Sequence, residues 1–300
     1  MNDIKKINNL QLETLLHYLK INFYNPSIID KINIHHYISI EHFLQTFTYQ
    51  RNKTLLYSKN VQDYRPIGLI NKYNNAFIYF PVPIENINKY DYQRYIKRMH
   101  LLIHNLAKSK PNTWIIDLRN NTGGDYTFFL ACFYPLFKTD GLIGSDYDKY
   151  GNKVHDYSIY NGRVETYRYD KNIGYGSEKS IVSIDKFIPT KKISNSTKVH
   201  NIAVLINNNT ASAAELLSLK FKNDGAKFYG KKSACAGTGI YYIEIKDDVP
   251  YIDGSSKNIN SAQNNITIIF PFALLHDKQN NPTECIIPDE KHIPEEYWPN

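Results

Sequence analysis

The sequence predicts an α/β protein with a mostly parallel sheet, and three observations support this. Residues 114–118 and 202–206 are short apolar runs rich in branched side chains, a pattern typical of buried strands. Each run ends in a polar turn and is followed by a segment of good helix formers, at residues 126–137 and 211–222. Strands that alternate with helices in this way favour parallel pairing.

Length and composition indicate one large domain with a small addition. The chain has 300 residues, of which 42% are hydrophobic, enough for a sizeable core. Leucines recur at helical spacing near the start, and a second amphipathic piece follows the break at Asn25-Pro26. We therefore expect a helical N-terminal region over residues 1–65 and an α/β domain over residues 66–300.

Charge and cysteine content narrow the class of protein further. The net charge is +7, but the Lys and Arg residues are scattered, so we expect no nucleic-acid partner and leave an acidic substrate or partner open. Three cysteines with no Cys-x-x-Cys pair argue against a disulfide framework and a zinc site, and favour reduced cysteines. No signal peptide and no apolar run of about 18 residues is visible, so we expect a cytoplasmic protein without membrane insertion.

The remaining elements follow from local patterns. Residues 76–82 are typical of a strand, and apolar positions from Tyr92 to Leu106 indicate an amphipathic helix. Asn161-Gly162 predicts a hairpin turn. Residues 173–198 are predicted to be mostly irregular, either a surface excursion or the border of a substrate groove.

Metal and cofactor sites are not predicted. His100 and His104 lie one helical turn apart, but no third ligand accompanies them, so we expect no metal. The turn after Leu118 lacks both the dinucleotide fingerprint and a phosphate-binding loop, and we expect no cofactor.

Ser212 is the residue with the clearest chemical potential. With Thr210 as the cap, it would lie in the first turn of a helix, just past a buried strand. Free backbone N–H groups and the helix dipole favour negative charge there, such as the oxyanion of a tetrahedral intermediate. The alternative is that Ser212 only caps the helix.

Three motifs resemble those of the C-terminal-processing, or tail-specific, serine proteases. Asp117-Leu-Arg-Asn-Asn-Thr-Gly-Gly124 is similar to the family's D-L-R-x-N-x-G-G signature, and Thr210-Ala-Ser-Ala-Ala-Glu215 to its T-A-S-A-x-E nucleophile motif. Ile286-Ile-Pro-Asp289 resembles the closing G-I-x-P-D element. The motifs occur in family order, within about residues 67–294.

The resemblance implies a core like that of ClpP and crotonase, built of strand–strand–helix units, without a PDZ insert. It implies an oxyanion hole formed by the N–H of Gly123 or Gly124 together with that of Ala213. The position of the family's base lysine is occupied by Ala236-Gly237, so a serine–lysine dyad is doubtful. The chain therefore looks closer to the tricorn and interphotoreceptor retinoid-binding branch.

In the tricorn type the general base is a histidine from a preceding helical subdomain. His36 is the matching prediction here; the alternative is that His36 is a solvated loop residue. Glu284 is predicted to orient this base or, alternatively, to bind a substrate amine. For Glu215 a helix-stabilising role is the simpler interpretation.

The first hypothesis is a serine endopeptidase that cleaves a peptide or protein substrate through an acyl-enzyme on Ser212. The second is a non-catalytic protein of the same fold that binds a peptide or a lipid. The third is an acyl-CoA hydratase of the crotonase-like fold, although such chemistry does not need a serine in this motif. The sequence is compatible with an oligomer as well as with a monomer.

Overall fold

The computed structural model describes most of the α/β domain. The described residues are 16, 66–80, 89–169, 180–183, 201–236, 238–246, 249–253 and 266–299. Except for Leu16, the predicted helical region 1–65 lies outside them, and so does His36. The predicted domain boundary therefore stays a prediction.

A five-stranded sheet forms the centre of the described part, in the order β1-β2-β3-β8-β9. Its strands are β1 (Ile67–Ile70), β2 (Ala76–Tyr79), β3 (Trp114–Asp117), β8 (Ile202–Ile206) and β9 (Lys227–Gly230). Only the β1–β2 pairing is antiparallel; the other three are parallel. This confirms the α/β class and the mostly parallel sheet, and it brings the ends of β3 and β8 to the same edge.

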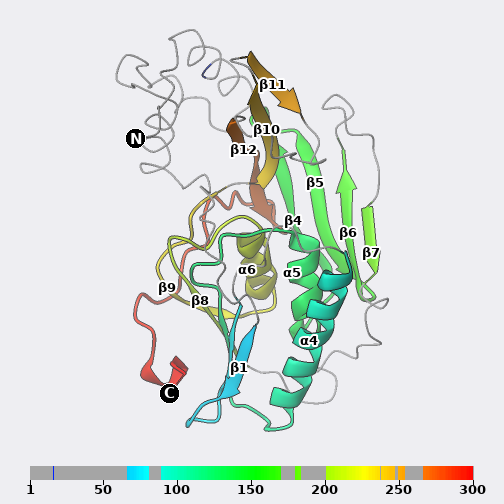
Figure 1. Ribbon diagram of the computed structural model, residues 1–300. Helices are drawn as coiled ribbons and strands as arrows, with labels where there is room; N and C mark the ends of the chain where they lie inside the picture. The colour runs from blue at the N-terminus through cyan, green and yellow to red at the C-terminus, as the bar shows by residue number, and fades with distance from the viewer. Residues whose placement is uncertain are drawn as a thin grey trace, which may run out of the picture.

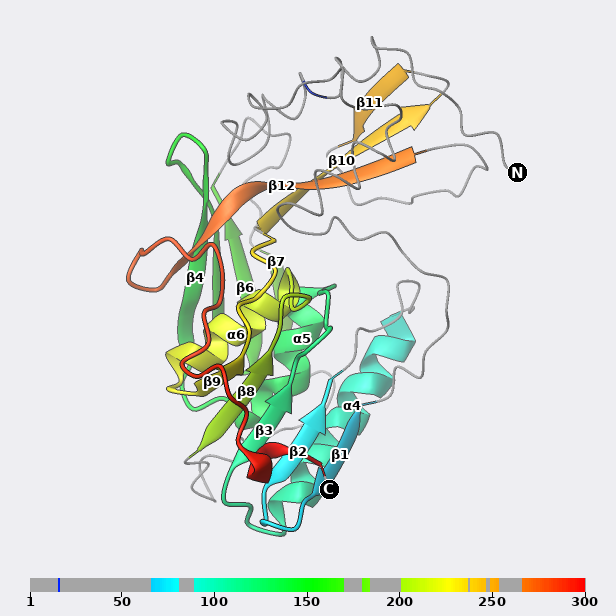
Figure 2. The same cartoon turned by 90° about the vertical axis from the view of Figure 1, so that its left-hand side faces the viewer.

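Three helices cover one face of this sheet (Figure 2). They are α4 (Lys89–Ala107), α5 (Tyr126–Phe133) and α6 (Ala213–Asn223). Ile116 and Val204 point into the core that these helices share, whereas their neighbours Ile115 and Leu205 belong to a separate cluster on the other face. This alternation is expected for strands buried on both faces.

Helix α5 ends earlier than the sequence predicts. The expected helix reached residue 137, but α5 ends at Phe133 and continues as a 3-10 turn, η2 (Tyr134–Leu136). Pro135 explains the change, because proline has no N–H to donate and disrupts the turn before it.

A second sheet of seven antiparallel strands lies on the other side of the helices (Figure 1), in the order β11-β10-β12-β4-β5-β6-β7. Its strands are β4 (Gly141–Asp148), β5 (Lys153–Tyr160), β6 (Arg163–Arg168), β7 (Ser180–Ser183), β10 (Thr238–Lys246), β11 (Val249–Asp253) and β12 (Ile266–Asp277). The predicted hairpin is confirmed, since Asn161 (φ 49°) and Gly162 (φ 74°) join β5 to β6. Strand β7 lies within the stretch predicted to be mostly irregular, and the rest of that stretch lies outside the described residues.

The C-terminal segment packs on the face of the central sheet opposite the helices. The backbone N–H of Phe228 donates to Asp289 Oδ2 (2.7 Å), and that of Gly230 to the carbonyl of Glu290 (2.9 Å). Near the end, in the turn η5 (Glu295–Tyr297), the Tyr297 ring packs edge-on against Tyr229. The tail thus forms part of the core on this face.

The prediction that no disulfide forms is wrong. Cys235 and Cys285 are joined by a disulfide, and the free Cys132 is buried in α5. The pairing could not be foreseen from spacing, because 50 residues separate the two cysteines and the fold brings their segments together.

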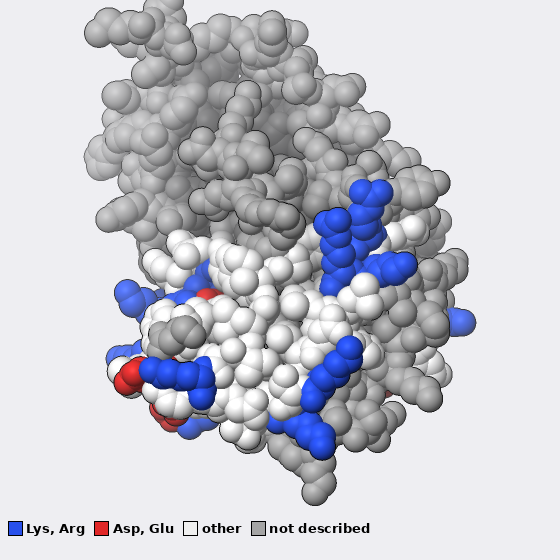
Figure 3. Space-filling model, turned by 60° about the horizontal axis from the view of Figure 1, so that its bottom comes forward, with Lys and Arg blue, Asp and Glu red and all other residues white. Residues whose placement is uncertain are grey.

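The surface agrees with scattered charge. On the face in Figure 3, some of the described Lys and Arg side chains lie together in small groups, and uncharged surface lies between these groups. Within the described ranges, no helix is long and apolar enough to cross a membrane. The expected absence of a nucleic-acid partner stays a prediction.

Candidate active site

The loops after β3 and β8 meet at the edge of the central sheet. The N–H of Asn120 donates to Asn207 Oδ1 (3.0 Å), and Asn207 Nδ2 donates back to Asn120 Oδ1 (2.9 Å). Thr210 Oγ1 donates to the carbonyl of Leu118 (2.9 Å), although 92 positions separate the two residues. Two of the three motifs noted in the sequence are therefore part of one site.

Ser212 is the N-cap of α6 and has a strained backbone. Its φ of 54° and ψ of −122° are rarely adopted by a residue with a side chain, and such strain costs about 1–3 kcal/mol. The expectation that Thr210 caps the helix is wrong, because its hydroxyl is engaged with Leu118 and with the N–H of Asn207. Ser212 thus lies on a sharp strand-to-helix turn, and the surrounding structure holds it in this strained conformation.

Gly123 approaches this turn more closely than any other residue type could. Its φ is +99°, and a Cβ added to it would lie 2.7 Å from both Ser212 Cβ and the carbonyl oxygen of Ala211. Neither neighbour can move without disturbing the turn. A glycine is therefore required at position 123 by both conformation and space.

The backbone donors beside Ser212 are not equivalent. The Gly123 N–H already donates to Asn121 Oδ1 (3.0 Å). Within the described part of the chain, the N–H groups of Gly124 and Ala213 have no acceptor. Since Ala213 is the first residue of α6, its N–H also lies at the positive end of the helix dipole. An anion between these two N–H groups would be stabilised.

Glu215, three residues after Ser212, is a buried carboxylate that accepts four hydrogen bonds. The donors are the N–H groups of Ser212 (2.9 Å), Cys235 (3.0 Å) and Ala236 (3.1 Å) and the hydroxyl of Ser233 (2.5 Å). Burial raises the pKa of Glu215 to about 7, and the hydrogen bonds oppose this rise because they stabilise the charged form. The sequence suggested only a helix-stabilising role.

The loop after β9 is held by the C-terminal segment. The N–H of Ser233 donates to the carbonyl of Ile286 (3.0 Å), and the N–H of Ile286 donates to Ser233 Oγ (2.8 Å). The Cys235–Cys285 disulfide joins the same two segments. The third motif, at residues 286–289, is thereby connected to Ser212 through Ser233 and Glu215.

The two residues expected to complete the catalytic machinery are not brought together by the described structure. His36 lies outside the described residues. Glu284 is exposed and precedes Cys285, and it makes no hydrogen bond or ion pair within the described part. Lys231 and Lys232 are exposed just after β9. The assignments of His36 and Glu284 stay predictions.

A histidine–aspartate pair that sequence reasoning missed lies in the second sheet. His155 Nδ1 is 3.2 Å from Oδ2 of the buried Asp146, which also accepts a hydrogen bond from the Tyr157 hydroxyl (2.5 Å). The Tyr157 ring packs edge-on against Tyr126, two positions after Gly124. Asp146 and His155 are cross-strand partners around the turn at residues 149–152, and this hairpin register was the signal that could have revealed them.

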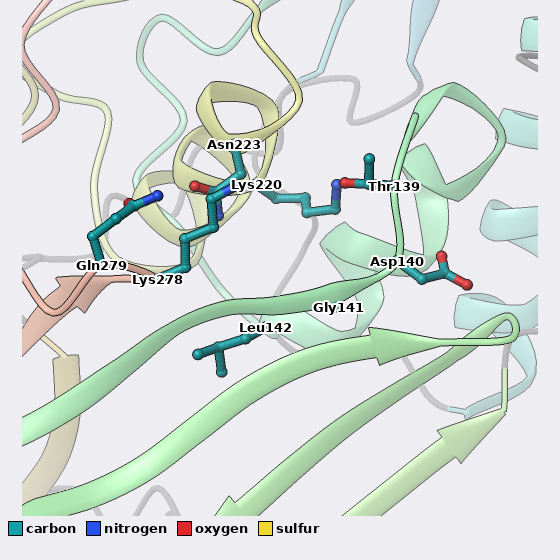
Figure 4. Close-up of a pocket in the computed structure, with 8 residues that line it drawn as sticks. All are labelled: Thr139, Asp140, Gly141, Leu142, Lys220, Asn223, Lys278 and Gln279. Carbon is teal, nitrogen blue, oxygen red and sulfur yellow. The ribbon is translucent and has the colours of Figure 1, made fainter.

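A separate polar cavity of about 380 Å³ lies at the other end of α6 (Figure 4). Lys220 and Asn223 of α6 line it, with Lys278 from the turn after β12 and residues around the start of β4. Because α6 has 11 residues, this end is about 16 Å from Ser212. The cavity is therefore not part of the site around Ser212.

The fold and these loops define an α/β protein that presents a serine on a strained strand-to-helix turn beside open backbone amides, an arrangement known from serine hydrolases. Residues 84–256, more than half of the chain, match the family described as Peptidase family S41. The chain belongs to peptidase family S41, which confirms the resemblance to the tail-specific proteases.

Similar proteins give a consistent picture. Over 180 residues the chain is 33% identical to a nisin-resistance protein of Lactococcus lactis subsp. lactis, covering 58% of this chain and 48% of that protein. The chain thus matches about half the length of this curated relative.

Two solved structures are also similar. A lipoprotein from Streptococcus agalactiae has a TM-score of 0.52 and 16% identity, over 97% of this chain and 93% of that one. For the photosystem II D1 C-terminal processing protease the values are 0.43 and 17%, over 74% and 43%. At these identities the likeness to solved structures concerns the fold alone.

Proposed function

We propose that this protein is a serine endopeptidase that cleaves peptide bonds through an acyl-enzyme on Ser212. One observation carries the proposal: Ser212 occupies a strained turn at the N-terminus of α6, in contact with Gly123 and beside two open N–H groups. Membership of peptidase family S41 supports a serine-type peptidase.

In this proposal the oxyanion hole consists of the N–H groups of Gly124 and Ala213. Gly123 is less suited to donate, because its N–H is engaged by Asn121. Its role is to let the loop approach Ser212 without a side chain. Two N–H groups that need no reorganisation stabilise the tetrahedral intermediate more than the planar substrate, which is how they accelerate acyl transfer.

The chemistry requires a general base within reach of the Ser212 hydroxyl. The base takes the hydroxyl proton while Oγ attacks the substrate carbonyl, and it then gives the proton to the leaving amine. Water, deprotonated by the same base, then attacks the carbonyl of the acyl-enzyme. Ser212 Oγ leaves and takes the proton back from the base, and the second product is released. We propose His36 as this base, oriented by Glu284, and His155 with Asp146 as the alternative that the described structure offers.

The biological role and the location belong to the proposal as well. The Lactococcus lactis relative is named a nisin-resistance protein, so we include a role in resistance to nisin in the proposal. The expectation of a cytoplasmic protein stays a prediction. The Cys235–Cys285 disulfide weighs against it, since disulfides persist mainly in oxidising compartments.

The test is labelling with a fluorophosphonate probe, followed by identification of the modified peptide. We expect the wild type to be labelled on Ser212 and Ser212→Ala not to be labelled. Loss of labelling in His36→Ala but not in His155→Ala supports His36 as the base, and the reverse supports His155. A folded wild type that is not labelled contradicts the proposal and favours the non-catalytic binding protein.

A further inference from the structure

We propose that Glu215 is a positioning residue whose carboxylate holds Ser212 in the conformation that presents its hydroxyl for reaction. The inference rests on the proposed function. It assigns to Glu215 a role that neither a helix-stabilising acid nor a general base would have.

The first step is the arrangement of donors around the two carboxylate oxygens. Oε2 accepts from the N–H groups of Ser212 and Ala236, and Oε1 accepts from the N–H of Cys235 and the hydroxyl of Ser233. Because Ser233 Oγ already accepts from the N–H of Ile286, its own hydrogen is directed to Glu215. All four neighbours donate to the carboxylate, and the three N–H groups among them can only donate, so the site favours a group that accepts on both oxygens.

The second step is the effect on Ser212. Its N–H is bound by Glu215 Oε2, and its carbonyl accepts from the backbone N–H of Glu215 (2.8 Å). The two bonds fix the peptide groups on both sides of the strained Ser212 backbone. Without the carboxylate, rotation to a negative φ would relieve the strain and move both Oγ and the Ala213 N–H.

The third step concerns the loop that Glu215 joins to this turn. Cys235 also has a positive φ, of 59°, and its sulfur is tied to Cys285. A single buried side chain therefore joins the serine turn, the loop at residues 233–236 and the C-terminal segment. Its position at the N-terminus of α6 is where the helix dipole favours negative charge.

These contacts predict a specific defect for Glu215→Gln. Glutamine has nearly the same shape, but its NH₂ group must replace one of the two oxygens. In place of Oε2 the NH₂ faces the N–H groups of Ser212 and Ala236, and two hydrogen bonds are lost. In place of Oε1 it faces the N–H of Cys235, where one hydrogen bond is lost, while the Ser233 hydroxyl can turn and accept from it. A buried group left without its partner is costly, and the serine turn would shift to relieve it.

Asp224→Asn is the matched control. Asp224 is equally buried, lies at the other end of α6 and accepts from the N–H and hydroxyl of Thr139, the N–H of Lys138 and Nζ of Lys220. The same acid-to-amide change there should lower stability without touching the serine turn.

The experiment measures kinact and KI for the fluorophosphonate probe with folded protein, under conditions in which both variants remain folded. We expect kinact to fall about 10- to 100-fold in Glu215→Gln, with KI nearly unchanged, and kinact of Asp224→Asn to match the wild type. Ser233→Ala, which removes one of the four donors, should give an intermediate loss. Equal kinact in Glu215→Gln and Asp224→Asn would overturn the inference and leave the proposed function intact.

Amide hydrogen exchange gives a readout that does not depend on activity. In Glu215→Gln we expect faster exchange in residues 207–213 and 233–236 than in Asp224→Asn of similar stability. If the wild type is not labelled, the proposed function fails, and exchange still decides whether Glu215 holds the turn. Unchanged exchange in both segments would contradict the positioning role.

Discussion

The site depends on single residues whose conformation or partners no other residue could reproduce. Gly123 is the clearest case, because its Cα lies against the Ser212 turn. Gly141 has a positive φ as well (130°), but nothing lies within 4 Å of a Cβ added there. Substitutions at the two glycines therefore distinguish the effect of backbone strain from the effect of a steric clash.

We expect Gly123→Ala to lower the rate of probe labelling at least about 100-fold, because displacing the reacting group by about 1 Å has an effect of that size. Gly141→Ala shares the backbone strain without the clash and should label like the wild type. The rate of fluorophosphonate labelling checks both variants. Normal labelling of Gly123→Ala would show that the loop is not close to Ser212.

His100 is a buried histidine whose charge the fold opposes. Its Nε2 is 2.7 Å from the carbonyl of Ala131, and its Nδ1 has no hydrogen-bond partner among the described residues. Burial lowers the pKa of His100 to about 4 from the ordinary 6.5. Between pH about 4 and about 6.5, only the unfolded state binds this proton. The contribution of His100 to the free energy of unfolding therefore rises with pH, by about 3 kcal/mol across this range.

The prediction is that His100→Leu removes this rise in the free energy of unfolding between pH about 4 and about 6.5. Urea unfolding at a series of pH values measures it. His104→Gln serves as the control on the same helix and should keep the wild-type slope. A slope that survives in His100→Leu would mean that His100 is not held neutral.

At the scale of elements, the helices α5 and α6 carry the site because each begins where a parallel strand has just ended. The loop after β9 adds a third contribution, and the Cys235–Cys285 disulfide ties it to the C-terminal segment. The bond closes a loop of about 50 residues, for which the chain-entropy model gives a stabilisation of about 4 kcal/mol.

We therefore expect the double variant Cys235→Ser/Cys285→Ser to lose about 4 kcal/mol in the free energy of unfolding. Dithiothreitol should lower the stability of the wild type to the same level and leave the double variant unchanged. Urea unfolding with and without the reductant measures this. The prediction would be contradicted if dithiothreitol left the free energy of unfolding of the wild type unchanged under conditions in which folded and unfolded protein equilibrate.

At the scale of the whole molecule, the C-terminal segment joins the central sheet to the site. Asp289 accepts from the N–H of Phe228, and its own N–H donates to the Phe228 carbonyl (2.9 Å). Earlier in the same segment, Ile286 exchanges hydrogen bonds with Ser233, and Cys285 forms the disulfide with Cys235. The resemblance of residues 286–289 to a family motif thus has a physical basis in the attachment of this segment.

Asp289→Ala should destabilise the protein by about 1.5–3 kcal/mol, the usual effect of losing a hydrogen bond to a charged group. It should also slow probe labelling, because the segment that holds the loop at residues 233–236 is loosened. Glu290→Ala is the control, since its side chain meets only the exposed Lys227 among the described residues. Thermal unfolding and labelling of the two variants measure the effects, and equal behaviour would contradict this role.

The central sheet and the serine turn were the parts of the molecule most open to prediction. The strand at residues 202–206 and the hairpin at Asn161-Gly162 are confirmed, because each depends on a pattern within a few residues. Strands β4 and β10 to β12 were missed. The pairing of β4 with β12 joins segments more than 100 positions apart, which local periodicity does not record, whereas β10–β11 and β4–β5 are pairs of strands adjacent in the chain whose patterns were overlooked.

The sequence by itself determined the α/β class, the order of the core elements and the position of Ser212 between a buried strand and a helix. Branched apolar runs, helix formers and glycines act within a few residues, so their effect is visible in the chain. Only the tertiary structure decided that Ser212 rather than Thr210 caps α6, that Cys235 pairs with Cys285, and that Glu215 gathers four donors. Apart from the bond between Ser212 and Glu215, these outcomes depend on groups 18 to 92 positions apart, whose approach the packed core determines.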